Sequence, residues 1–135
     1  MFTTVYISRS TTDLNADDLT ALLTECRIKN RRRGLTGMLL YREGQFIQAL
    51  EGPEYMVHAT MDRIMKDPRH VEVEVLAEEE VKGRQFPGWS MGYREIDEAA
   101  SLTMPGYRGV LTSGRGAAQS STTEAKLLLE WFRAN

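Results

Sequence analysis

The chain has 135 residues, which is enough for one domain with a single hydrophobic core. Its formal net charge of −2 gives no global attraction to nucleic acid or to an anionic membrane surface. The single cysteine, Cys26, excludes an internal disulfide, and no apolar run is long enough to span a bilayer, so we expect a cytoplasmic protein without a membrane segment.

The first half of the chain predicts a strand, a helix and a hairpin. Residues 2–8 have the pattern of a strand, and Asn15 is placed to cap a helix that runs to about Arg31 and ends before Gly34. Residues 35–42 and 45–51 are two apolar runs joined by Glu43-Gly44, the minimal length for a β-hairpin.

The second half predicts one more helix and two more strands. Gly52-Pro53 opens a helix that Asp67-Pro68 ends. Its expected buried stripe comprises Val57, Met61, Ile64 and Met65. Residues 71–75 alternate apolar and acidic side chains, and a last strand is expected over residues 86–95. The order β-α-β-β-α-β-β predicts an α+β, ferredoxin-like sheet with two helices on one face.

The composition changes after residue 96, so we expect a domain over residues 1–96 and a C-terminal extension over residues 97–135. Residues 105–122 have the composition of a loop, and Ser121 to Glu124 form a capping box before a short apolar terminal helix. The second face of the sheet, which carries Ile47 and Ala49, needs a cover. The terminal helix or a second subunit of a homo-oligomer would supply it.

Three uncharged polar side chains lie where the local pattern calls for apolar ones. Tyr6 is in the first strand, Gln48 lies between Phe46 and Leu50 on one strand face, and Asn30 continues the apolar stripe of the first helix. A buried amide or phenol is costly unless it is hydrogen-bonded. Either the three satisfy one another and the backbone, or they share a polar partner that the chain itself does not supply.

No catalytic or metal-binding motif is present: the sequence has no CxxC pair, HExxH motif or P-loop, and His58 and His70 lack metal-ligand spacing. Basic residues gather at the end of the first helix. They are Arg27, Lys29, Arg31, Arg32 and Arg33. They either complement the helix dipole or contact the phosphates of a ligand beside the helix. Nucleic acid is the weakest interpretation, because no aromatic platform accompanies the charge.

Five segments in the same order give the chain a resemblance to the BLUF family, the flavin-binding blue-light sensor domains, over roughly residues 2–95. The segments are Tyr6-Ile7-Ser8-Arg9, Asn30 with Gly34-Leu35-Thr36-Gly37, Gly44 to Gly52, Asp67-Pro68-Arg69-His70, and Arg84 to Met91. The family fold is the one expected above. The resemblance implies that FAD fills the polar pocket between the two helices and the sheet.

The resemblance also implies which residues respond to light. The photoactive tyrosine of the family falls on Tyr6, its switching glutamine on Gln48, and the pair on its fifth strand on Trp89 and Met91. An excited flavin would take an electron from the phenol, and the phenolic proton would follow to the glutamine. The amide suits this task because it offers both a donor and an acceptor and exchanges them by rotation or tautomerism.

Further residues are expected to contact the flavin. The anchoring asparagine falls on Asn30, and Arg69 and His70 match the family loop in which a basic residue approaches the flavin ring. Lys29 stands where other members carry a different polar side chain, beside the anchoring asparagine.

The function implied by the resemblance is a reversible, non-enzymatic blue-light photoreceptor. No cyclase, phosphodiesterase or DNA-binding segment follows, so its output is expected to be a contact with itself or with an unidentified protein partner. Two other classes stay open on the residues alone. One is an acylphosphatase-like hydrolase that uses Asn30 and an arginine, and the other is a flavin-free regulatory ligand-binding module.

Overall fold

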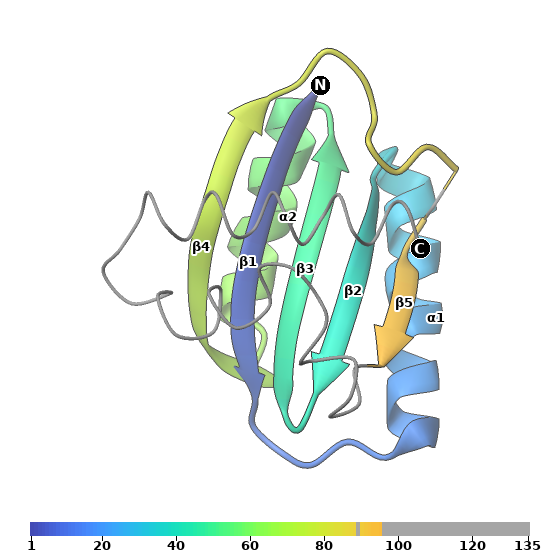
Figure 1. Cartoon of the computed structure of the whole chain (residues 1–135), viewed down its shortest axis with the longest axis vertical. Coiled ribbons are helices and arrows are strands. Elements are labelled where there is room, and N and C mark those ends of the chain that lie inside the picture. The colour runs from blue at the N-terminus through green and yellow to red at the C-terminus, as the bar shows by residue number, and fades with distance from the viewer. Residues whose placement is uncertain (89, 96–135) are drawn as a thin grey trace, which may run out of the picture.

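The computed structural model describes residues 1–88 and 90–95, over which a pair of helices covers one face of a five-stranded sheet (Figure 1). The strands are β1 Phe2–Ser10, β2 Thr36–Arg42, β3 Gln45–Gly52, β4 His70–Glu80 and β5 Gly92–Glu95; the helices are α1 Ala16–Arg33 and α2 Glu54–Lys66. The strand order is β4-β1-β3-β2-β5; β5 runs parallel to β2 and the other pairs are antiparallel. The expected α+β, ferredoxin-like fold is confirmed. Trp89 and the expected extension over residues 97–135 lie outside the described residues.

Local sequence signals account for the ends of α1 and for the hairpin. The side chain of Asn15 accepts a hydrogen bond from the Asp18 N–H (2.8 Å), and the Asp18 carboxylate accepts one from the Asn15 N–H (3.1 Å), which forms a capping box. Gly34 ends the helix in the left-handed conformation, with φ of 69°. Glu43 and Gly44 both have positive φ, as a two-residue hairpin turn requires.

The strand register places Tyr6, Gln48 and Leu39 next to one another on the face of the sheet that the helices cover. Tyr6 pairs with Gln48 across β1 and β3, and Gln48 pairs with Leu39 across β3 and β2. Side chains of both helices complete this core, which includes Leu19, Leu23, Leu50, Val57 and Met61. The residues next in sequence face the other side of the sheet. Val5, Met38, Leu40, Ile47 and Ala49 are there, and each is at most 2% exposed.

The expectation for the buried stripe of α2 is wrong at one position. Met65 is 53% exposed, whereas Thr60 is buried beside Val57 and Met61. A helix turns by about 100° per residue, so Thr60 and Met61 lie on either side of the direction of Val57, whereas Met65 lies about 80° from it. The helix also begins at Glu54, one residue later than the pattern placed it, with Pro53 as its N-cap.

The two last strands differ in length from the expectation. β4 continues to Glu80 because it pairs with β1 as far as Phe2. The last strand begins only at Gly92 rather than at residue 86. Gly88 has a φ of 77°, and the backbone N–H groups of residues 85 and 86 donate to the carboxylate of Glu51. The chain therefore turns before β5, within the range of residues 86–95 over which a strand was expected.

No helix among the described residues combines the length and the apolar character that crossing a membrane requires.

Candidate functional site

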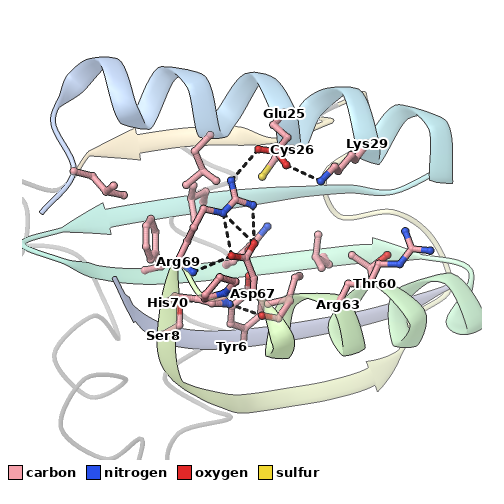
Figure 2. Close-up of a pocket in the computed structure, with 18 of the residues that line it drawn as sticks. Tyr6, Ser8, Glu25, Cys26, Lys29, Thr60, Arg63, Asp67, Arg69 and His70 are labelled. Atoms are coloured by element: carbon pink, nitrogen blue, oxygen red, sulfur yellow. Dashed lines mark hydrogen bonds and ion pairs between the residues drawn. The ribbon is translucent and has the colours of Figure 1, made fainter. Parts of the chain in front are cut away.

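A cavity of about 560 Å³ lies between α1 and α2 above the helix-covered face of the sheet (Figure 2). Its volume falls within the range of about 300–1,000 Å³ that is typical of small-molecule and cofactor sites. Six of the expected site residues line it, namely Tyr6, Lys29, Asn30, Gln48, Arg69 and His70. Met91 lies next to Gln48 although it is not part of the cavity wall.

Tyr6 and Gln48, which line the cavity, form a hydrogen-bonded relay with Met91, which does not. The Tyr6 O–H donates to Gln48 Oε1, and Gln48 Nε2 points to Met91 Sδ at 3.8 Å. Tyr6 is 2% exposed, and burial raises the pKa of its phenol well above the usual range. The phenol therefore keeps its proton, which it donates in the hydrogen bond to Gln48.

Asn30 reaches from α1 to the segment that precedes β5. Its Nδ2 donates to the Ser90 carbonyl at 2.6 Å. One turn earlier on the same helix, Arg27 Nε donates to the Met91 carbonyl at 3.0 Å. An asparagine amide has two N–H groups and a carbonyl oxygen, so Asn30 retains a donor and an acceptor for a partner in the cavity that it lines.

Four charged residues, here called the ion-pair strap, connect α1 to the loop after α2. Arg69 Nη1 lies 2.8 Å from Glu25 Oε2 and Arg69 Nη2 lies 2.6 Å from Asp67 Oδ2, while Lys29 Nζ lies 2.6 Å from Glu25 Oε1 (Figure 2). The hydrogen bonds from Lys29 and Arg69 lower the pKa of Glu25, and Arg69 lowers that of Asp67. Asp67 in turn raises the pKa of Arg69. The strap therefore joins α1 to the 67–69 loop through ion pairs.

His70 is fixed by two protein partners. Its Nε2 lies 2.5 Å from the Ile64 carbonyl, and because a carbonyl only accepts, this nitrogen carries a proton. Its Nδ1 lies 3.0 Å from Ser8 Oγ, and the ring meets Tyr6 edge-on at 6.4 Å between centroids. Contacts of His70 and Arg69 with a flavin stay a prediction. In this structure the polar groups of both side chains bond within the protein.

Sequence reasoning missed several residues of this site. Thr60, Arg63 and Asp67 line the cavity, and Arg27 contacts the segment before β5. Thr60 had a usable signal, because it interrupts an apolar helix stripe in the way that Asn30 does. Its Oγ1 is buried without a hydrogen-bond partner among the described residues, as expected of a group that meets a ligand. Within the same residues there is no group of three or more potential metal ligands.

The cavity therefore combines apolar surface with polar and charged side chains. Leu22, Leu39 and Ile64 supply apolar surface, and the Asn30 amide and the Thr60 hydroxyl supply hydrogen-bonding groups. Apolar surface together with these hydrogen-bonding groups fits an aromatic ring system that has a polar edge, such as a flavin.

Comparison with known proteins agrees with this chemistry. A family model described as sensors of blue light using FAD matches residues 1–92. Photoactivated adenylate cyclase subunit beta of Euglena gracilis is 32% identical over 111 residues, which make up 82% of this chain and 13% of that protein. The chain thus spans only a small fraction of this curated relative.

Solved structures give the same result. The dark-state structure of BlrB, a BLUF protein, has a TM-score of 0.73 at 29% identity, with 93% of this chain and 96% of BlrB covered. A bacterial light-regulated adenylyl cyclase has a TM-score of 0.70 at 29% identity, with 93% of this chain and 36% of the cyclase covered. The photo-activated state of BlsA has a TM-score of 0.77 at 25% identity, with 99% and 95% covered. With a family match over residues 1–92 and a shared fold, the chain belongs to the BLUF family of flavin-binding blue-light sensors.

Proposed function

We propose that this chain is a blue-light receptor that binds FAD in the cavity between α1 and α2 and signals through protein contacts rather than by catalysis. The observation that supports the proposal is the relay that runs from Tyr6 and Gln48 in the cavity to Met91. It combines a protonated phenol, an amide with two hydrogen-bonding roles and a residue adjacent to β5.

When bound, the flavin would supply, on excitation, an oxidant for a neighbouring phenol, and it would return the electron when the two recombine. While it lacks that electron, the Tyr6 phenol is strongly acidic, so its proton passes along the existing hydrogen bond to Gln48 Oε1; a proton returns to Tyr6 together with the electron. Gln48 then changes which end of its amide donates, by rotation or tautomerism. Either change alters the contact of its Nε2 with the sulfur of Met91, and a donor turned toward the cavity would change the absorption of the ligand there.

The output is proposed to leave through Met91 and β5, because Met91 joins the relay to the strand that follows it. Light-regulated adenylate cyclases among the relatives contain a matching domain within much longer chains, which supports transfer of the signal to another protein domain. We further propose that the sensor domain ends near residue 96 and that the protein forms a homo-oligomer. Its signal is proposed to pass to a protein partner that is not yet identified. The single cysteine supports a cytoplasmic location.

An acylphosphatase-like reaction receives less support. That reaction would place the chain outside the family of flavin-binding sensors whose model matches residues 1–92.

The test is the absorption spectrum of the purified protein in darkness and under blue light. The wild-type protein should be yellow, shift its band to the red on illumination, and recover in darkness. Tyr6→Phe and Gln48→Leu should both stay yellow and lose the shift, because the first lacks the transferable proton and the second lacks the amide. Tyr55→Phe is a matched control, since Tyr55 is 73% exposed on α2, and it should shift normally. A normal reversible shift in Tyr6→Phe or in Gln48→Leu would refute the proposed mechanism.

A further inference from the structure

Met91 is held from two directions. Its sulfur faces Gln48 Nε2 at 3.8 Å, and its backbone carbonyl accepts a hydrogen bond from Arg27 Nε of α1 at 3.0 Å. The Met91 side chain is 1% exposed, and the residue stands directly before β5. A movement of the Gln48 amide and a movement of α1 therefore both act on the same residue.

The contact from α1 is made by a pair of side chains. Arg27 and Asn30 are three residues apart, so they project from the same side of the helix. Asn30 Nδ2 donates to the Ser90 carbonyl, and Arg27 Nε donates to the next carbonyl, that of Met91. Pairing of β5 with β2 starts only at Gly92. The carbonyls that α1 binds therefore lie just before the first paired residue of β5.

Arg27 suits such a hold better than a lysine would. Its guanidinium is planar, carries donors in fixed directions and makes charge-assisted hydrogen bonds. Arg27 is half-buried, which limits competition from water. β5 has four residues and pairs with β2 at the edge of the sheet, and so short an edge strand depends strongly on contacts from neighbouring elements.

We propose that Arg27 is a positioning residue that holds Met91 against Gln48 in the dark, and that rearrangement of Gln48 in the light weakens this hold. The inference rests on the proposed function, because it uses the switching of Gln48. A rearrangement shifts an equilibrium only through contacts that differ between its two states. The Arg27–Met91 hydrogen bond is that differential contact, and it makes α1 as well as β5 responsive to light.

The first test uses the protein in darkness. Amide hydrogen exchange over residues 92–95 is compared in the wild type, Arg27→Met, Arg27→Lys and Arg32→Met. Arg32 is the matched control, because it is an exposed arginine on the same helix. Loss of one charge-assisted bond should speed exchange in Arg27→Met by roughly tenfold, with Arg27→Lys closer to Arg27→Met than to the wild type. Wild-type protection in Arg27→Met would overturn the hold.

The second test measures recovery in darkness after illumination. The dark state of Arg27→Met lacks a bond that the light state has already weakened, so recovery should slow by roughly tenfold, while Arg32→Met recovers at the wild-type rate. Unchanged or faster recovery in Arg27→Met, with the red shift intact, would overturn the release of the hold by light. A wild-type protein without any red shift would overturn the release together with the proposed function, and the exchange data would still decide whether Arg27 holds β5.

Discussion

Replacement of Glu51 by glutamine should lower the free energy of unfolding by about 3 kcal/mol. The side chain is fully buried, and its carboxylate accepts hydrogen bonds from the Thr36 hydroxyl (3.0 Å) and from the N–H groups of Gln85 (2.8 Å) and Phe86 (2.5 Å). An amide keeps one oxygen, so at least one donor would face an NH₂ group. Each charge-assisted bond contributes about 1.5–3 kcal/mol, roughly twice a neutral one, and the easier burial of an amide offsets some of the loss.

Urea or thermal unfolding in darkness measures this effect. For a domain of this size, a loss of about 3 kcal/mol corresponds to a fall in melting temperature of roughly 10 °C. Glu54→Gln is the matched control, because Glu54 is exposed on α2, and it should stay within about 0.5 kcal/mol of the wild type. If Glu51→Gln also stays within about 0.5 kcal/mol, the network around this carboxylate does not hold residues 85 and 86 in place.

Three further predictions concern the cavity and its charges. Asn30→Ala should weaken flavin binding roughly tenfold to hundredfold and lower stability less, because a buried amide partner is lost; flavin retained after dialysis measures it, and full retention would contradict the anchoring role. The lowered pKa values of Glu25 and Asp67 mean that their stabilising contribution is present above about pH 4 and is lost as the pH falls through the lowered values. Glu25→Gln should therefore show a shallower loss of stability on acidification in urea unfolding, and an unchanged slope would rule out the strap as its cause. The raised pKa of Tyr6 predicts a loss of stability at alkaline pH. The free energy of unfolding falls as the pH rises above about 10, because the phenol then ionises in the unfolded state and not in the folded state. Tyr6→Phe should lessen this alkaline loss, and an identical alkaline unfolding curve would show that other groups cause it.

The periodicity of apolar residues and the residues at the turns were sufficient to predict most of the fold. Helix α1 has both of its expected end signals, and the hairpin turn falls on Glu43 and Gly44. The polar positions Tyr6, Asn30 and Gln48 were identified because each breaks an apolar pattern, and all three line the same cavity. Their roles toward a flavin stay predictions.

Interactions between distant segments were not predictable in the same way. Arg27 lies in a basic cluster, and nothing in the spacing indicates that its partner is a backbone carbonyl 64 positions away. Glu51 ends an apolar strand, where an acidic side chain usually faces solvent, yet it captures the backbone of Gln85 and Phe86. That capture, together with the turn at Gly88, shortened the last strand, because a local alternation pattern carries no information about a competing acceptor.

The strand order also has a consequence for how the protein acquires its ligand during folding. β1 lies between β3 and β4, so Tyr6 obtains its neighbours Gln48 and Val75 only after much of the chain that follows has folded back. Pairing between segments so far apart is slow and leaves strand edges open in the meantime. The cavity walls include residues from β1 to His70, so a nascent chain has no complete flavin site until the 67–70 loop has docked. A ligand that binds only the folded state shifts the equilibrium between unfolded and folded protein toward the folded form. We therefore expect a larger flavin supply during synthesis to raise the fraction of the protein that folds rather than aggregates.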